Sequence, residues 1–284
     1  MVSASAKRKM VKDLVEAHEM SQRHGCELIE VARSTAQYQA KRPVDEVELA
    51  QAIRDLAEQH PRYGYRPITA LLKRAGWRVN HKRVQRIWRQ EGLQLPRRKP
   101  RKQRVGTSTG DVYRATHKNH VWSYDFLEAR TERGGRLRIL AVMDEYTRQC
   151  LAIEVARSMP SQRVMQVLSW LFLVHGNPEH LRSDNGPEFV AHAVQRWLPQ
   201  QGCQTMYITP GSPWENPFIE SFIGKLRDEC LNCYIFANGR EAQQIVEEWR
   251  MEYNTYRPHS SLGYLTPAEF ALQQHDLSLQ VAHK

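Results

Sequence analysis

Three acidic residues in the second half of the chain have surroundings in which a carboxylate is expected to do chemistry. Asp125 interrupts an apolar stretch, Asp184 precedes an Asn-Gly turn, and Glu220 has apolar helical neighbours. A lone carboxylate is costly to bury, so an acid in a buried strand needs a partner or a metal ion. Three carboxylates from a sheet and an adjacent helix could hold two Mg²⁺ ions roughly 3.5 to 4 Å apart. Mn²⁺ is the alternative ion.

Such a pair of ions would supply an activated attacking oxygen and a stabilised leaving 3′ oxygen at a phosphodiester, without a covalent protein intermediate. For any one of these acids alone, an unrelated surface carboxylate is the competing interpretation. Asp144 and Glu188 could also lie nearby without being ligands. The hypothesis therefore requires a fold that gathers distant parts of the chain.

A zinc site is the alternative metal centre that the sequence offers. Cys230 and Cys233 have Cys-x-x-Cys spacing, and His18, His24 and Cys26 lie near one another in the sequence. A closed zinc site needs four ligands, and no His or Cys pair at finger spacing accompanies either group. Ordinary structural cysteines are the favoured interpretation.

The second half of the chain carries the pattern of a mixed sheet that could position the three acids. Strands are expected at 120–127, 136–144, 149–155, 180–183 and 204–208. Tight links between the first three predict an antiparallel meander, and helices alternating with the later strands add parallel pairing. Helices are expected at 161–174, 189–201, 215–231 and 241–253. The prediction is an α+β chain whose mixed five-stranded sheet is flanked by helices.

The first half reads as short helices, with a helix-turn-helix as its clearest unit. Helical apolar spacing covers 7–18 and 45–59, and the segment 21–38 is consistent with a small helix-turn-helix that has Gly25 in its turn and Ser34 as an N-cap. Further on, a break at 61–67 is followed by a helix at 68–74. Gly76 turns the chain and Asn80 is placed to cap the next helix.

That capped helix, which runs through residue 90, has the pattern of a DNA-recognition helix. Val84, Ile87 and Trp88 form one apolar stripe, and basic side chains occupy the remaining surface. The basic residues expected to contact DNA here are Lys82, Arg83, Arg86 and Arg89. A run of charged residues that faces only solvent normally contains both acidic and basic side chains. The stretch 62–104 has fifteen basic residues and one acidic residue, which favours a surface that faces DNA.

The chain has a net charge of +10, and its charged residues are distributed unevenly along the sequence. Residues 1–110 hold 24 Lys and Arg against 11 Asp and Glu, and residues 111–284 hold 17 against 20. Clustered cations favour a polyanionic partner because neutralising phosphates releases condensed counterions. The stretch 97–118 is expected to be an extended basic linker along DNA. Its DNA-binding candidates are Arg97, Arg98, Lys99, Arg101, Lys102 and Arg104.

Other features argue against a secreted or membrane protein. The five cysteines form no regular framework, and the first residues lack the pattern of a signal peptide. The longest apolar stretch, 164–174, is shorter than the roughly 18 residues that a membrane span needs. The expectation is a protein of the reducing cytoplasm.

Several motifs together resemble one known family. They are Trp122-Ser123-Tyr124-Asp125-Phe126, Ser183-Asp184-Asn185-Gly186-Pro187-Glu188-Phe189, Pro210-Gly211-Ser212-Pro213-Trp214-Glu215-Asn216, Glu220-Ser221-Phe222, 224–232, and 253–259, with Arg62-Tyr63-Gly64-Tyr65-Arg66 and 79–84 upstream. These stretches resemble bacterial insertion-sequence transposases of the IS-three family, specifically the OrfB product. Asp184 and Glu220 are separated by 35 residues, which is the spacing typical of that family's Asp-Asp-Glu signature. Pro217 and Ile223 depart from the residues that are frequent there.

The resemblance implies a ribonuclease H-like catalytic core of the retroviral integrase type. It implies an Mg²⁺-dependent transposase that cleaves mobile-element ends, joins the 3′ hydroxyl to target DNA and recognises terminal inverted repeats. It also implies a homo-oligomer, a dimer or larger on DNA, and an upstream-frame partner product or fusion. The location that it implies is the bacterial cytoplasm, in association with the nucleoid. Lys225 and Arg227 are expected to contact DNA, with a structural salt bridge as the alternative for Arg227.

The expected organisation has five parts. They are a helical segment at 1–44, the helix-turn-helix domain at 45–96, the basic linker at 97–118, the catalytic core with C-terminal helices at 119–275, and a tail at 276–284. Two other functions stay open. A repressor or assembly factor could retain an idle catalytic fold, and a ribonuclease H-type nuclease on RNA-DNA hybrids is disfavoured by the helix-turn-helix.

Overall fold

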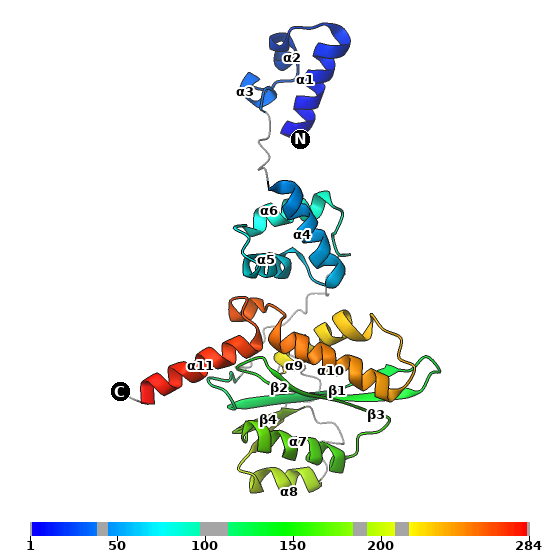
Figure 1. Cartoon of the computed structure of the whole chain (residues 1–284), viewed down its shortest axis with the longest axis vertical. Coiled ribbons are helices and arrows are strands. Elements are labelled where there is room, and N and C mark those ends of the chain that lie inside the picture. The colour runs from blue at the N-terminus through cyan, green and yellow to red at the C-terminus, as the bar shows by residue number, and fades with distance from the viewer. Residues whose placement is uncertain (1, 39–44, 97–112, 184–191, 208–215, 283–284) are drawn as a thin grey trace. The chain divides into compact units, whose positions relative to one another are not determined.

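The computed structural model describes residues 2–38, 45–96, 113–183, 192–207 and 216–282 (Figure 1). Asp184, Glu188 and the six basic residues expected to contact DNA between 97 and 104 lie outside the described residues. The chain divides into two compact units, residues 1–51 and residues 52–284.

The first unit contains the helices α1 (Ala4–His18), α2 (Gln22–Leu28) and α3 (Arg33–Ala36). The helix expected at 7–18 is confirmed, but the turn and cap expected after it are wrong. Gly25 lies inside α2 and is buried, with Val11 of α1 at ordinary van der Waals distance from it. Ala32, and not Ser34, is the N-cap of α3.

The helix-turn-helix region consists of α4 (Glu46–Gln59), α5 (Tyr65–Arg74) and α6 (His81–Gln90). The Asn80 side chain accepts a hydrogen bond from Arg83 N at 2.8 Å, which confirms the expected N-cap of α6. Gly76 and Gly92 have φ angles of 89° and 71°, the left-handed conformation that favours glycine where each helix stops.

A mixed five-stranded sheet forms the centre of the second unit, as the sequence pattern predicted. Its strands are β1 (Val121–Arg130), β2 (Arg136–Asp144), β3 (Cys150–Ala156), β4 (His180–Ser183) and β5 (Gln204–Tyr207), in the order β3-β2-β1-β4-β5. β1, β2 and β3 form the antiparallel meander. β4 pairs parallel with β1 on one side and β5 on the other.

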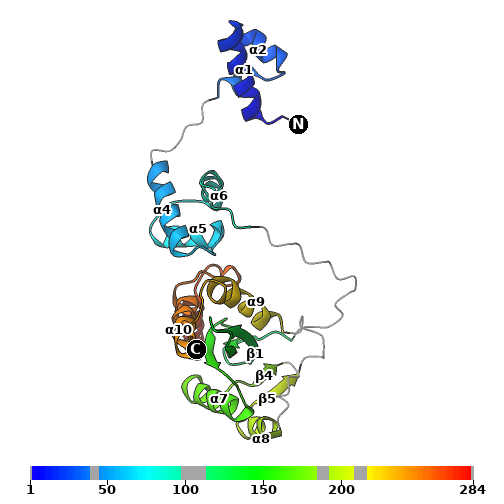
Figure 2. The ribbon, with the colours of Figure 1, turned by 90° about the vertical axis from the view of Figure 1, so that its right-hand side faces the viewer.

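Helices cover both faces of this sheet, in a three-layer arrangement visible in Figures 1 and 2. On one face, α7 (Ser161–His175) and α8 (His192–Gln200) pack with Trp122 and Tyr124 of β1. On the other face, α9 (Pro217–Leu226) and α10 (Gly239–Thr255) pack with Leu127 of β1. Alternate residues of β1 therefore point into different cores.

The helix expected at 215–231 is two structures in succession. α9 has Pro217 in its first turn, where the missing N–H of proline costs no hydrogen bond. From Arg227 to Leu231 the chain continues as η2, a wider π-helix. After α10, the short helix η3 (Ser260–Leu262) and α11 (Pro267–Ala282) were not predicted from the sequence.

None of the helices in the described ranges is long and apolar enough to cross a membrane. All five cysteines are free thiols, and four of them are buried. Cys230 lies in η2, where burial raises the pKa of its thiol to about 12. This agrees with a structural cysteine that is not activated as a thiolate.

A buried histidine is expected to make folding stability depend on pH. His259 packs edge-on against Tyr253, with ring centroids 4.6 Å apart, and burial followed by the Arg257 charge lowers its pKa to about 3. A histidine in the unfolded chain has a pKa of about 6.5, so between these values the unfolded chain binds the additional proton. This contribution to stability is therefore complete above pH 6.5 and is lost as the pH falls.

We expect the free energy of unfolding to fall by about 2 kcal/mol between pH 7 and pH 5 through His259 alone. His259→Gln should remove that part of the pH dependence, because glutamine cannot take up a proton. Urea denaturation at several pH values measures both slopes. Equal slopes in the variant and the original chain would contradict the assignment.

Candidate active site

Asp125 lies in the middle of β1, on the face of the sheet that α9 covers. It is opposite Ala141 of β2, and Ala141 and Leu127 both belong to the core beneath α9 and α10. The Asp125 side chain is partly exposed, and its Oδ1 accepts a hydrogen bond from Phe126 N at 2.7 Å. A carboxylate is thus held at the border of an apolar layer while still reaching solvent.

Glu220 lies in the first turn of α9, the helix that packs over this face. Ile219, Phe222 and Ile223 are buried against the sheet, and Glu220 is exposed beside them. Its backbone N–H donates to the Asn216 carbonyl at 3.3 Å, which closes the first turn. The structure therefore brings Asp125 and Glu220 to the same side of the sheet from positions 95 residues apart in the sequence.

The short strand β4 leads directly to Asp184, the third expected ligand. β4 pairs with β1 through Arg182 and Ser123, and its last residue, Ser183, is fully buried. Asp184 itself lies outside the described residues, so its position relative to Asp125 and Glu220 is untested.

A buried ion pair fixes the end of β4. Both Glu145 carboxylate oxygens accept bonds from Arg182 Nη1 at 3.0 Å, and Arg182 Nη2 donates to the Tyr113 carbonyl at 2.7 Å. The Ser123 hydroxyl donates to Glu145 as well. Burial raises the pKa of Glu145, and the Arg182 charge and the Ser123 hydrogen bond partly offset that rise. Through Glu145, Ser123 of β1 and Arg182 of β4 are thereby linked. Each of these two residues lies two positions before an expected aspartate ligand.

A second arginine positions the start of α9. The guanidinium carbon of Arg148 lies 3.5 Å from the centroid of the Phe218 ring, two residues before Glu220. Arg148 has a left-handed φ of 62°, and burial lowers its pKa while Glu145 acts in the opposite direction. A partly desolvated cation on an aromatic face contributes roughly 1 to 2 kcal/mol. This contact holds the N-terminal turn of α9 against the β2-β3 turn.

Asp144 has a structural role and is not part of the candidate metal site. Its carboxylate accepts hydrogen bonds from Asn119 N and Thr147 N, each at 2.7 Å, and from the Thr147 hydroxyl at 3.0 Å. With only 1% of its surface exposed, it closes the turn after β2.

The basic residues expected to contact DNA lie on two separate elements in the described part of the chain. On α6, Lys82, Arg86 and Arg89 are exposed and Arg83 is half-buried. After Glu220, Lys225 donates to the Ser221 carbonyl and hydroxyl at 3.1 and 2.7 Å. Arg227, at the start of η2, is exposed. DNA contact by any of these residues stays a prediction.

A histidine cluster next to the start of β1 is an arrangement with metal-ligand spacing among the described residues. Glu179 Oε1 lies 3.2 Å from His117 Nε2, and Glu179 Oε2 lies 3.8 Å from His120 Nε2. His120 Nδ1, however, accepts a hydrogen bond from Thr116 N at 3.0 Å, which places the ring proton on Nε2. The hydrogen bonds therefore favour a structural cluster over a metal site.

This cluster is also remote from the candidate active site. His120 directly precedes Val121, which pairs with His180 at the start of β4. Asp125 lies four residues after Val121, or roughly 13 Å further along an extended strand. Neither cysteine group considered from the sequence belongs to a cluster of possible ligands in the described residues.

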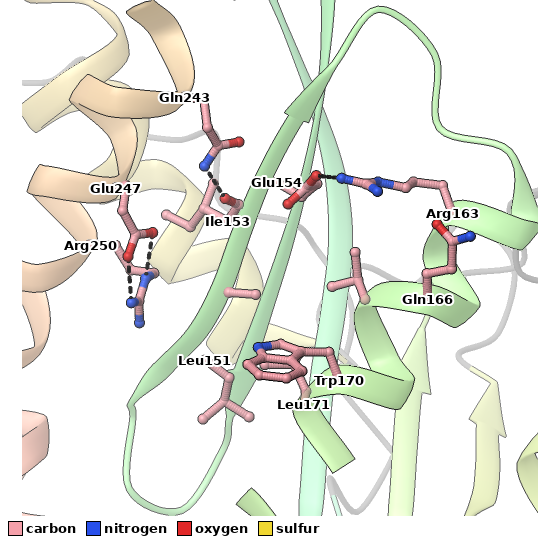
Figure 3. A pocket seen from close by; sticks show the side chains of 12 residues that line it. Leu151, Ile153, Glu154, Arg163, Gln166, Trp170, Leu171, Gln243, Glu247 and Arg250 are labelled. Carbon is pink, nitrogen blue, oxygen red and sulfur yellow. Dashed lines mark hydrogen bonds and ion pairs between the residues drawn. The ribbon is translucent and has the colours of Figure 1, made fainter. Parts of the chain in front are cut away.

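The cavity drawn in Figure 3 lies at the outer edge of the sheet, away from Asp125. It has a volume of about 340 Å³ and is bounded by β3, α7 and α10. Glu154 pairs with Arg163 and Glu247 with Arg250 at its rim, where the Trp170 ring also lies. β3 is two strands from β1, or roughly 10 Å, so this cavity is a separate feature.

The donor atoms at the candidate site fit a hard divalent cation such as Mg²⁺, which prefers oxygen ligands. Asp125 and Glu220 supply carboxylate oxygens. Among the described residues, Ser183 Oγ and Asn216 Oδ1 are buried and have no hydrogen-bond partner. Ser183 precedes Asp184 and Asn216 precedes α9, so both polar atoms belong to the segments that lead to expected ligands.

Comparison with known proteins identifies the family of the chain. Two family models described as integrase core domain match residues 115–213 and 201–267, and one described as HTH-like domain matches residues 44–101. The chain is 37% identical over 252 residues to an insertion element IS407 protein of Burkholderia multivorans, covering 89% of this chain and 91% of that protein. It is 28% identical to the Escherichia coli transposase InsD of insertion element IS2, covering 82% and 81%. The chain belongs to the IS-three family of insertion-sequence transposases.

A solved structure shows that this IS-three family member shares its fold with retroviral integrases. A simian T-cell lymphotropic virus intasome chain superposes with a TM-score of 0.50 at 14% identity, covering 78% of this chain and 74% of that one. At this identity the likeness concerns the fold alone. The expected ribonuclease H-like core and the preceding helix-turn-helix region are confirmed.

Sequence reasoning missed the residues that support the site. Glu145 and Arg148 lie in the tight link between the second and third expected strands, where the sequence pattern indicates only a turn. A signal for both exists in the sequence, because Asp144-Glu145 and Arg148 place three charges in a turn between two apolar strands. Their partners, Arg182 and Phe218, are 37 and 70 residues away, and only the folded chain identifies them.

Proposed function

We propose that this IS-three family transposase cleaves DNA at the ends of its mobile element and joins the freed 3′ hydroxyl to target DNA. The observation that carries the proposal is the position of Asp125 and Glu220 on one side of the sheet, next to the strand that leads to Asp184. The proposed metal ligands are Asp125, Asp184 and Glu220. Two bound Mg²⁺ ions would supply the activated attacking oxygen and the stabilised leaving oxygen.

Covalent connectivity supports Asp184 as the third ligand. Arg182 pairs with Ser123, and each expected aspartate follows two residues later on its own segment. Consecutive Cα atoms are about 3.8 Å apart, so the Cα of Asp184 lies within about 7.6 Å of that of Arg182. A carboxylate within β1 and one that directly follows the adjacent parallel strand β4 could share a pair of cations.

The protein's own residues would orient the reacting groups. The Glu145 and Arg182 ion pair holds the ends of β1 and β4 in register, and Arg148 holds α9 through Phe218. Holding reacting groups in place lowers the entropic part of the barrier. In this proposal Lys225 and Arg227, beyond Glu220, bind the phosphates that flank the scissile bond.

The exposed basic face of α6 is proposed to read the terminal inverted repeat. Its apolar stripe of Val84, Ile87 and Trp88 is buried, which leaves Lys82 and Arg89 exposed. A helix of this kind enters the major groove while its cations neutralise phosphates.

Lys82→Ala and Arg89→Ala should each weaken binding to an element end. Each should also lower the slope of log affinity against log salt by about 0.9 for every phosphate that the variant no longer neutralises. Fluorescence anisotropy at several salt concentrations measures this slope. Arg240→Ala removes an exposed cation at the start of α10 and is the matched control. Equal slopes in all three variants and the original chain would exclude the α6 contact.

Assembly on DNA is part of the proposal. The retroviral neighbour comes from an intasome, and for this chain we propose a dimer or larger assembly that holds two element ends. A partner product from an upstream frame is the second proposed partner. Sedimentation of the chain with and without labelled ends tests the assembly.

The proposal is tested by incubating the chain with labelled candidate ends and Mg²⁺ and scoring nicked and joined strands separately. We expect both products, and we expect EDTA to abolish them. A chain that binds ends in an assembled complex but performs no strand chemistry would instead be a repressor or assembly factor. Cleavage of an RNA-DNA hybrid in preference to element ends would favour the nuclease alternative.

A further inference from the structure

The turn that precedes α5 is packed against the C-terminal helices of the same compact unit. Tyr63 OH donates to Glu252 Oε1 of α10 at 3.1 Å, and His60 Nδ1 lies 3.1 Å from the same oxygen. The His60 ring stacks on Tyr63 at 4.6 Å and on Tyr256 at 5.2 Å between centroids. Tyr63 is only 5% exposed. This burial identifies a fitted contact and not a chance approach of two surfaces.

The same turn reaches the π-helix that continues α9. Arg62 forms an ion pair with Asp228 of η2. The next residue, Glu229, accepts bonds from Arg257 at 2.7 and 2.5 Å, and this second pair is almost fully buried. The Arg257 guanidinium in turn lies 5.4 Å from the Tyr63 ring centroid. The charged residues of the turn before α5 and those of η2 and Arg257 therefore form one cluster.

The last residue of α5 makes a further contact with the C-terminal region. Arg74 Nη1 donates to the Tyr256 carbonyl at 3.0 Å, and Nη2 donates to the Tyr264 carbonyl at 2.9 Å and to Glu269 Oε2 at 2.8 Å. These bonds join residues more than 180 positions apart in the sequence. Both ends of α5 are thus attached to the C-terminal helices.

None of these attachments uses the basic face of α6. The contacts come from the turn before α5 and from its last residue, and Lys82 and Arg89 of α6 stay exposed. The recognition helix is consequently fixed through α5, its neighbouring helix, and its cations stay accessible. We call the contacts of Arg62 with η2, of Tyr63 with α10, and of Arg74 with the end of α10 and with α11 the α5 joint.

We propose that the α5 joint holds the recognition helix and the Glu220 helix as one body, so that Arg62, Tyr63 and Asp228 are positioning residues for cleavage. Asp228 lies on the continuation of α9, eight residues after Glu220, so the joint attaches directly to the helix that carries a proposed ligand. The effect of the joint on cleavage rests on the proposed function. Because the two helices then form one rigid body, the distance between the bound repeat and the cleaved phosphodiester is fixed.

The joint can be tested without any activity, by hydrogen exchange of the α5 backbone amides in the full chain. Asp228→Arg places two like charges opposite each other. It should speed α5 exchange at least tenfold and leave β1 unchanged. The double reversal Arg62→Asp with Asp228→Arg should restore slow exchange. Glu248→Arg, an exposed acid on α10 outside the joint, is the matched control. Unchanged α5 exchange in Asp228→Arg would overturn the joint.

The catalytic consequence is tested with labelled element ends and Mg²⁺. Asp228→Arg should bind ends with unchanged affinity but cleave them at least tenfold more slowly or at several positions. The double reversal should restore both the rate and the position of cleavage. Faster cleavage by Asp228→Arg would overturn the proposal, because the joint would then restrain the enzyme. If the original chain cleaves nothing, the proposed function fails, and the exchange experiment still decides whether the joint exists.

Discussion

Asp125→Asn is expected to abolish strand cleavage and to leave the binding of element ends intact. The substitution keeps the shape of the side chain but removes the negative charge that would hold divalent cations beside the phosphodiester. Loss of cation stabilisation worth about 4 kcal/mol corresponds to a roughly thousandfold fall in rate. Because Asp125 is partly exposed on a strand, the fold should tolerate asparagine. Single-turnover cleavage and anisotropy on the same labelled ends measure the two properties separately.

The matched control for this experiment is Glu128→Gln. Glu128 lies on the same strand, is exposed and pairs with Arg136, so its loss removes an acid without touching the proposed site. Cleavage by Glu128→Gln should stay within about twofold of the original chain, since exposed pairs contribute little. Equal losses of cleavage rate in both variants would mean that any lost negative charge on β1 has this effect. Full cleavage by Asp125→Asn would show that Asp125 is not a metal ligand.

Arg182→Met is expected to cause the largest loss of stability, about 3 to 5 kcal/mol of unfolding free energy. The substitution leaves Glu145 fully buried without its cation, which costs far more than the ion pair contributes when intact. Removing both charges, with Arg182→Met and Glu145→Leu together, should recover part of the loss because no uncompensated charge is left. Urea denaturation of these variants gives the comparison.

Arg163→Met supplies the control for that series. Arg163 is 48% exposed and pairs with Glu154 across the surface of α7 and β3. Its loss should cost at most about 1 kcal/mol. If Arg182→Met cost no more than Arg163→Met, the buried pair would not be what fixes the end of β4. A stable Arg182→Met variant that had lost cleavage would assign Arg182 a more direct role.

Much of the fold could be predicted because its elements have strong local signals. Apolar and β-branched runs separated by short turns marked the strands, and Asn80 marked the start of α6. The sequence could not show that Gly25 lies inside a helix, because glycine is the usual residue of a turn and no local signal marks its burial beside α1. It could not show η2 either, whose residues Asp228 and Glu229 pair with Arg62 and Arg257, which are distant in the sequence.

The candidate site divides in the same way. Asp125 and Glu220 could be selected because an acid in an apolar setting is unusual and because the motifs resemble a known family. The supporting pairs, Glu145 with Arg182 and Arg148 with Phe218, could not be predicted, because partners far apart in sequence leave no periodic pattern. The same holds for the α5 joint, whose motif at Arg62 and Tyr63 was assigned only to the helix-turn-helix.

The most direct test of the central claim is to locate Mn²⁺ by anomalous diffraction in crystals of the chain bound to an element end. The account predicts two peaks about 3.5 to 4 Å apart, both in contact with carboxylates of Asp125, Asp184 and Glu220. A peak at His117, His120 and Glu179 with none beside Asp125 would contradict it. So would an Asp184 side chain directed away from Asp125 in the DNA-bound state.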